Sequence, residues 1–143
     1  MAPLPRQKAD AFWLAVKDRV AAGATEVLVA ELGSELVGTV QLVMAQPENQ
    51  LHRADVAKML VHRRVRRRGV GRALMKAAEE LARAKGKTLL VLDTASDEAE
   101  RLYQGMDWTM VGRVPGYALF PDGRPCDTTI FYKQLAPSSA ALP

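Results

Sequence analysis

The chain has 143 residues, of which 48% are hydrophobic and 25% charged, and its formal net charge is +4. This composition is typical of globular proteins, and the length suits a single domain over residues 1–143. No apolar run approaches the roughly 20 residues that span a bilayer, and the first residues lack the apolar core of a signal peptide, so we expect a cytoplasmic protein without a membrane segment. The single cysteine, Cys126, excludes an internal disulfide, and the two histidines, His52 and His62, are too far apart in sequence to indicate a metal site.

The first half of the chain is predicted to hold one helix and three strands. Residues 9–22 have apolar side chains on one helical face, and Gly23 follows as a stop signal. Runs of β-branched and large apolar residues predict strands over 25–30, 36–44 and 55–62, the first two forming an antiparallel hairpin.

The second half alternates helices and strands before a final hairpin. We expect helices over 69–85 and 96–103, strands over 88–93, 108–119 and 127–134, a tight turn over 121–125 and a frayed tail over 136–143. The order of elements predicts an α/β (α+β) fold, with a mixed, mostly antiparallel sheet flanked by helices.

An arginine cluster followed by two glycines lies between a predicted strand and a predicted helix. Six arginines fall within ten residues, and the cluster runs into Gly69-Val70-Gly71. Glycines let backbone N–H groups approach a ligand closely, and the start of a helix attracts anions, so the segment predicts a pyrophosphate site. The third glycine of a dinucleotide-binding fingerprint is missing, and the chain has no Gly-Lys-Ser/Thr of a P-loop.

This segment resembles motif A of the GNAT superfamily of acetyl-CoA-dependent N-acetyltransferases, in which Arg66, Gly69 and Gly71 fill the defined positions. The resemblance covers roughly residues 10 to 135 and implies a GNAT-like fold with acetyl-CoA as co-substrate. Members of this family usually begin with a further β-α unit, which we expect this chain to lack. An absent edge strand leaves backbone donors unpaired and favours pairing with a second chain, so a homodimer is expected.

The resemblance also implies which residues hold acetyl-CoA. Backbone N–H groups of residues 68–72 would cradle the phosphates, and arginine side chains would supply charge. The end of the preceding strand would polarise the thioester through its amides, and Ser96 stands where relatives carry an asparagine that bonds pantetheine. The expected cofactor-binding residues are therefore Leu60, Val61, Arg66, Arg67, Arg68, Gly69, Val70, Gly71, Arg72 and Ser96.

Three residues are candidates for the catalytic chemistry. Ala99-Glu100-Arg101-Leu102-Tyr103 matches the family's Ala-x-x-Leu-Tyr helix, which implies that the Tyr103 hydroxyl protonates the CoA thiolate. Asp55, at the start of a strand, and Asp93, at the end of the central strand, are both candidates for the general base. Either carboxylate could instead only attract the cationic amine or cap its strand.

The final hairpin resembles a subgroup related to tabtoxin-resistance acetyltransferases, through its Pro-Asp-Gly turn and its Asp-Thr-Thr-x-Phe-Tyr-Lys-x-Leu ending. The resemblance implies a small amine or an amino-acid-like antimetabolite as acceptor. Tyr117 and Asp127 could line the acceptor pocket, although strand alternation also permits both to face solvent.

Two other functions compete with an active N-acetyltransferase. A degenerate family member would bind CoA as a sensor or partner module. A nucleic-acid-binding protein would use the arginine cluster, but no aromatic residues interleave the arginines to stack on bases, so we do not expect a nucleic-acid partner.

Overall fold

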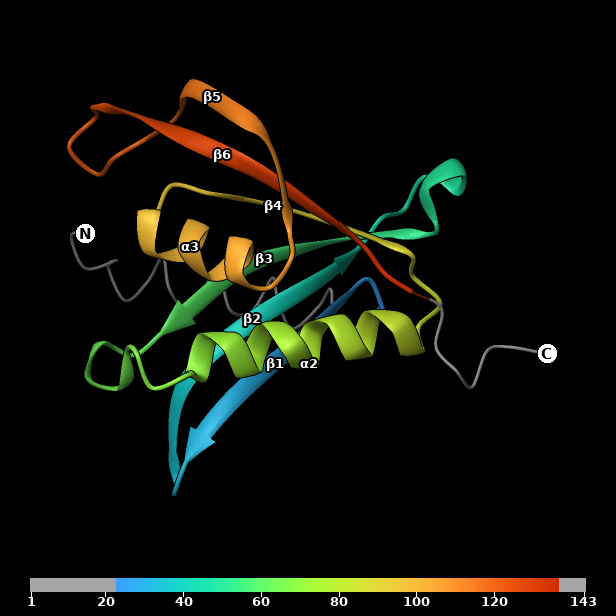
Figure 1. The fold of residues 1–143 in the computed structure, drawn as a ribbon, viewed down its shortest axis with the longest axis horizontal. Coiled ribbons are helices and arrows are strands. Elements are labelled where there is room, and N and C mark those ends of the chain that lie inside the picture. The colour runs from blue at the N-terminus through green and yellow to red at the C-terminus, as the bar shows by residue number, and fades with distance from the viewer. Residues whose placement is uncertain (1–22, 137–143) are drawn as a thin grey trace.

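The computed structural model describes residues 23–136. The elements follow one another as a three-stranded start, a helix, a strand, a second helix and a two-stranded hairpin (Figure 1). Their bounds are β1 Thr25–Leu32, β2 Glu35–Met44, β3 Arg53–Val61, α2 Val70–Ala84, β4 Leu89–Thr94, α3 Asp97–Gly105, β5 Thr109–Leu119 and β6 Pro125–Gln134, with short 3-10 turns η1 Glu48–Gln50 and η2 Arg63–Val65. The predicted helix over 9–22, and all but the first residue of the predicted tail, lie outside the described residues.

The six strands form one sheet in the order β1-β2-β3-β4-β6-β5, and the predicted fold class is confirmed. Every neighbouring pair is antiparallel except β3 and β4. That parallel pairing covers only three residue pairs, from Arg53 with Leu89 to Asp55 with Val91. Beyond Asp55 each strand continues without the other, so the sheet opens between β3 and β4.

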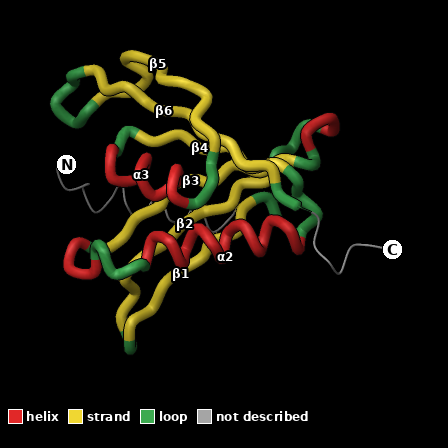
Figure 2. The backbone as a smooth tube through the Cα atoms, viewed as in Figure 1, coloured by secondary structure: helices red, strands yellow, loops and turns green. Residues whose placement is uncertain are grey.

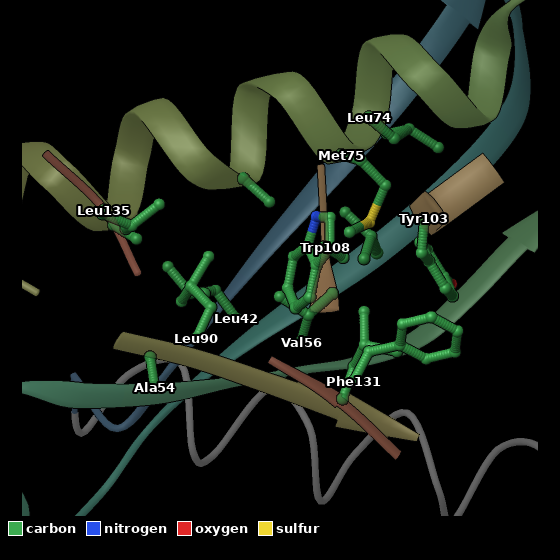
Figure 3. Close-up of a cluster of buried hydrophobic side chains, with 14 of the residues drawn as sticks. Leu42, Ala54, Val56, Leu74, Met75, Leu90, Tyr103, Trp108, Phe131 and Leu135 are labelled. Carbon is green, nitrogen blue, oxygen red and sulfur yellow. The ribbon is translucent and has the colours of Figure 1, made fainter. Parts of the chain in front are cut away.

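Helices α2 and α3 cover the same face of the sheet (Figures 1 and 2). α2 buries Leu74, Met75 and Ala78 against β1 to β3. α3 buries Tyr103 against Trp108 and Phe131, the last of which is fully buried (Figure 3). Burial of this continuous apolar cluster is the main favourable term that joins the helices to the sheet.

Most predicted element bounds lie within two residues of the structure, and the final strand shows the physical reason for a difference. It begins at Pro125, a residue that we predicted in the turn, because the β5–β6 ladder reaches Leu119 opposite Pro125. Between Val114 and Ala118 the register slips, and the extra β5 residues bulge away from β6. Asp127 stabilises this bulge by accepting a 2.9 Å hydrogen bond from the Gly116 amide.

A buried carboxylate joins α2 to the far half of the sheet. Glu79 is 4% exposed, and its carboxylate accepts from Trp108 Nε1 at 3.3 Å and pairs with Lys133 Nζ at 2.7 Å. The Lys133 ammonium also donates to the Met106 carbonyl at 2.8 Å. The charge on Glu79 is therefore compensated at a junction of α2, β6 and the loop after α3. Within residues 23–136, neither helix is long and apolar enough to cross a membrane.

Replacing Glu79 by alanine is expected to lower the free energy of unfolding by about 3 kcal/mol, because Lys133, whose side chain is only 19% exposed, loses its counter-charge and Trp108 Nε1 loses its acceptor. Urea unfolding measures the change. Glu80→Ala, on the exposed side of the same helix, is the control and should change stability by less than about 0.5 kcal/mol. Equal stability of the two variants would show that the Glu79 pair contributes nothing to the junction.

Candidate active site

The segment before α2 turns sharply so that the helix begins with open backbone amides. Gly69, at the N-cap, has φ of +80°, and Arg67 has φ of +65°, both in the left-handed region. The first intrahelical bond runs from the Ala73 amide to the Gly69 carbonyl at 3.0 Å. The amides from Gly69 to Arg72 precede that bond and are the unsatisfied donors of the helix start, which is the arrangement that binds phosphate.

A cavity of about 460 Å³ opens beside this helix start, between the end of β3 and the first turns of α3. Its size is in the range of small-molecule sites. Most predicted cofactor-binding residues line it together. The lining residues are Met59, Leu60, Val61, Val65, Arg66, Arg67, Gly69, Val70, Gly71, Arg72, Ser96, Glu98, Ala99 and Leu102.

Two glycines permit the close packing on which the cavity depends. A methyl group at Gly71 would lie 3.4 Å from Leu102 Cδ2 and would fill space between α2, α3 and β3. A methyl group at Gly38 on β2 would lie 2.9 Å from Leu74 Cδ1, so this glycine lets α2 rest directly on the strand. The helix start and the end of β3 are thereby held side by side.

Strand β3 is irregular beside the cavity. Lys58 has φ of +55°, and the β2–β3 register slips between Thr39 and Gln41, which defines a β-bulge. The His62 amide donates to β2 at 2.7 Å. Strand alternation then directs the Leu60 amide toward β2 and the amides of Met59 and Val61 toward the opening between β3 and β4.

The arginine cluster divides its side chains between the cavity and other contacts. Arg66, Arg67 and Arg72 line the cavity, and Arg64 instead forms an ion pair with Glu35 at the start of β2. Arg68, also among the predicted cofactor-binding residues, does not line the cavity, and its amide donates to the Val65 carbonyl at 3.3 Å. Three guanidinium groups therefore surround the open amides of α2 with positive charge.

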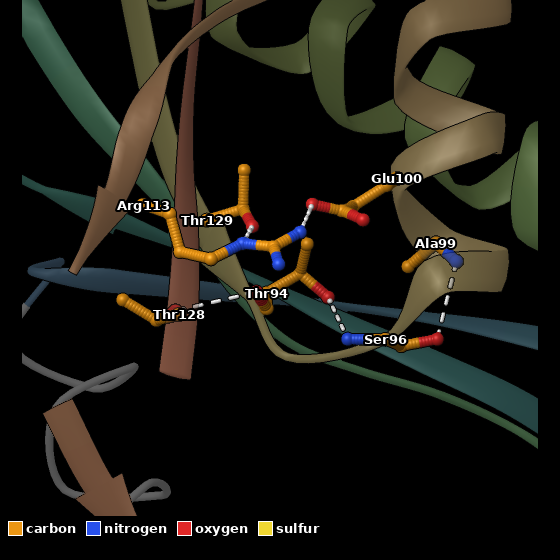
Figure 4. A network of polar contacts seen from close by, with 7 residues as sticks. All are labelled: Thr94, Ser96, Ala99, Glu100, Arg113, Thr128 and Thr129. Carbon is orange, nitrogen blue, oxygen red and sulfur yellow. Dashed lines mark hydrogen bonds and ion pairs between the residues drawn. The ribbon is translucent and has the colours of Figure 1, made fainter. Parts of the chain in front are cut away.

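Ser96 connects the cavity to the start of α3. Its hydroxyl oxygen accepts from the Ala99 amide at 3.2 Å and caps the helix, while its own amide donates to Thr94 Oγ1 at 3.1 Å (Figure 4). Because a serine hydroxyl can donate while it accepts, Ser96 can cap α3 and still donate a hydrogen bond into the cavity.

Tyr103 lies behind the cavity wall and is not among the lining residues. It is 5% exposed, and its ring contacts Trp108 and Phe131 at centroid distances of 5.9 and 5.7 Å. Burial, and secondarily the charge of Asp93, raises the pKa of Tyr103 to about 12. The neighbouring Leu102 lines the cavity, so the tyrosine ring forms the layer beneath it.

The two candidate carboxylates lie on the sheet face opposite α2, since the alternating neighbours Ala54 and Leu92 point into the core. Asp55 forms an ion pair with Arg53 on its own strand. Asp93 lies two residues beyond the last β3–β4 pair and accepts from Thr128 Oγ1 at 2.8 Å. Neither residue lines the 460 Å³ cavity.

The two candidate acceptor-binding residues are separated from that cavity. Asp127 lines a second cavity of about 290 Å³ between α3 and the β5–β6 hairpin, and Tyr117 is 59% exposed on β5 and lines neither cavity. The second cavity is lined by Ala95, Asp97, Glu100, Arg113, Phe120, Pro125, Cys126, Asp127 and Thr129. In the described part of the chain, no group of His, Cys, Asp or Glu side chains could hold a metal ion.

Five cavity residues were not predicted from the sequence: Met59, Val65, Glu98, Ala99 and Leu102. Ala99 and Leu102 belong to the same Ala-x-x-Leu-Tyr motif as Tyr103, so that motif could have been used to predict them as cavity residues. Met59 follows a bulge at a lysine, and nothing in the sequence indicates positive φ at Lys58.

The structure is similar to solved acetyltransferases. A ribosomal-protein-alanine N-acetyltransferase from Brucella melitensis matches with a TM-score of 0.77 and 25% identity over 93% of this chain and 81% of that one. A protein from Salmonella typhimurium, solved with its cofactor acetyl-CoA, matches with a TM-score of 0.76 and 22% identity over 91% and 75%. A GNAT superfamily phosphinothricin acetyltransferase from Sinorhizobium meliloti, in complex with acetyl-CoA, matches with a TM-score of 0.76 and 16% identity over 92% and 73%.

The sequence itself matches the acetyltransferase (GNAT) family over residues 2–108, a range that includes the arginine-glycine segment, both central strands and all of α3. The chain belongs to the GNAT family of acetyltransferases.

Proposed function

We propose that the chain is an N-acetyltransferase that moves the acetyl group of acetyl-CoA to the amine of a small molecule. The proposal rests on one observation, the cavity of about 460 Å³. It is lined by the N-terminal amides of α2, by three arginines and by the end of β3 that is not paired with β4. A phosphorylated thioester needs hydrogen-bond donors for its anionic phosphates and amides that can reach its carbonyl oxygen. This cavity offers both.

Acetyl-CoA is the co-substrate. The amides from Gly69 to Arg72 would bind its pyrophosphate, with Arg66, Arg67 and Arg72 adding charge. The pantetheine arm would follow β3 toward the Lys58 bulge, where the amides of Met59 and Val61 would donate to the thioester carbonyl as negative charge develops on its oxygen.

Gly71→Asp is expected to weaken acetyl-CoA binding at least tenfold, or about 1.4 kcal/mol, because it fills the cavity and places a carboxylate beside the phosphates. Calorimetric titration with acetyl-CoA, CoA and a duplex oligonucleotide measures the affinities. Gly112→Asp on β5 adds the same charge in open space and should bind normally. Tight duplex binding without acetyl-CoA binding would instead support a nucleic-acid function.

Transfer requires two bond changes and two proton transfers. The neutral amine nitrogen attacks the thioester carbonyl carbon, the carbon–sulfur bond breaks, and the leaving thiolate takes a proton while the new amide nitrogen loses one. We assign protonation of the sulfur to the Tyr103 hydroxyl, which lies beneath the cavity wall. Burial raises the pKa of the phenol, so Tyr103 stays protonated and keeps the proton that it would donate to the thiolate.

Tyr103→Phe is expected to lower kcat by about 10²-fold while the KM for acetyl-CoA changes little, since the ring packing is retained. With a pKa of about 12, Tyr103 stays protonated up to strongly alkaline pH, so wild-type kcat should show no loss below about pH 10 from this group. A pH–rate profile of both proteins tests the assignment. A Tyr103→Phe protein that keeps the wild-type kcat would contradict it.

We assign the base role to Asp93 rather than Asp55. Asp93 is close enough to Tyr103 for its charge to raise the pKa of the phenol, whereas the charge of Asp55 is neutralised by Arg53. The two carboxylates face the same side of adjacent strands, about 8 Å apart by strand geometry. Asp93 would accept the amine proton through a water molecule.

Asp93→Asn should therefore lower kcat/KM by about 10²-fold at neutral pH, and the loss should shrink as rising pH deprotonates the amine in solution. Asp55→Asn is the matched control and should lower kcat/KM much less. If Asp55→Asn is the more damaging change in the pH–rate comparison, the two roles are reversed.

We propose a small amine, of amino-acid-like or antimetabolite type, as the acceptor, which the likeness of the final hairpin to tabtoxin-resistance acetyltransferases supports. Asp127, at the second cavity, and Tyr117, exposed on the same hairpin, are the acceptor-side candidates. A cytoplasmic location and a homodimer also remain proposals; among the described strands β1 and β5 are the sheet edges at which a second chain could add.

A further inference from the structure

Helix α3 carries Tyr103 and forms one wall of the co-substrate cavity, so its placement sets the geometry of the proposed reaction. It is only nine residues long. Isolated helices of fewer than about 12 residues are marginal in water, so contacts with the sheet have to hold α3 in place.

Three sides of α3 have different neighbours. Ala99 and Leu102 face the co-substrate cavity, and Tyr103 points down to the sheet. Glu100 lies on the opposite flank and lines the second cavity, beneath the β5–β6 hairpin. A contact at Glu100 therefore acts on the helix from the side away from acetyl-CoA.

The β5–β6 hairpin makes that contact through Arg113. Its Nη2 lies 3.5 Å from Glu100 Oε1, and its Nε donates to Thr129 Oγ1 at 3.3 Å (Figure 4). The Glu100 side chain is only 13% exposed, whereas that of Arg113 is 57% exposed. Hydrogen bonding to Thr129, with a smaller contribution from the charge of Arg113, lowers the pKa of Glu100, so the carboxylate is charged at neutral pH.

We propose that Arg113 is a positioning residue. Supported by its hydrogen bond to Thr129, Arg113 binds Glu100 and so fixes the rotation of α3 about its axis. That rotation brings Tyr103 to the reacting sulfur. This inference rests on the proposed role of Tyr103. A side-chain tip lies about 5–6 Å from a helix axis, so a rotation of about 20° moves it by about 2 Å. A misplacement of about 1 Å can cost about 10²-fold in rate. Even a weak tether therefore has a kinetic effect larger than its contribution to stability.

Steady-state kinetics of three hairpin variants test the proposal. Arg113→Met should lower kcat about tenfold or more with the KM for acetyl-CoA changed less than about twofold, because the phosphate site on α2 is untouched. Arg113→Lys retains a charge that can reach Glu100 and should recover most of kcat. Arg124→Met is the control, since Arg124 pairs with Asp122 inside the hairpin turn and makes no contact with α3 in the described structure.

A double-mutant cycle with Tyr103→Phe separates positioning from a general loss of structure. If Arg113 acts through the tyrosine, Arg113→Met should cause little further loss of kcat once the hydroxyl is gone. Losses in kcat that multiply in the double variant would overturn the proposal, as would an Arg113→Met protein with wild-type kcat.

Hydrogen exchange gives a readout that does not depend on activity. Amides of α3 should exchange faster in Arg113→Met than in the wild type, whereas those of α2 should be unchanged. If Tyr103→Phe retains full activity while Arg113→Met loosens α3 and lowers kcat, the tether stands and the acid assignment fails. Unchanged exchange in α3 would overturn the tether itself.

Discussion

The parallel pairing of β3 with β4 ends after three residue pairs, and the site depends on that short pairing. A continuous ladder would satisfy every backbone group along both strands and leave no place for an extended thioester between them. Because the pairing stops at Asp55 and Val91, the later amides of β3 face an opening, and the Lys58 bulge turns them further. On either side of this opening the outer strands stay paired in antiparallel ladders, β1 with β2 and β5 with β6.

The second requirement is that a helix should begin where the opening ends. Gly69 supplies the left-handed turn, Gly38 lets α2 lie directly on β2, and Gly71 leaves room between α2 and α3. None of these glycines has a functional side chain. Together they place the unpaired N-terminal amides of α2 beside the opening between β3 and β4. Arg66, Arg67 and Arg72 then make the local potential positive, so an anionic co-substrate is favoured both by position and by charge.

The sequence predicted what local patterns encode. The succession of helices and strands along the chain and the proposed phosphate-binding segment follow from apolar periodicity and from the spacing of Gly69 and Gly71, and the structure confirms the fold class. The sequence did not predict the features that arise from pairing between strands far apart in the chain. The Lys58 bulge, the slip between Val114 and Ala118, and the cavity at Glu100 depend on register, which side-chain alternation within one strand cannot specify. Glu79 was missed for a related reason, since its partners Trp108 and Lys133 lie far along the chain.

The most direct test of this account is to follow backbone amide resonances of the isotope-labelled protein during titration with acetyl-CoA. We expect the largest shifts at Gly69, Val70, Gly71 and Arg72 and at Met59 and Val61, with little change at Gly116 and Gly123 in the β5–β6 hairpin. Shifts concentrated in the hairpin, with the amides at the start of α2 unchanged, would contradict the claim that the opening between β3 and β4 and the start of α2 together form the co-substrate site.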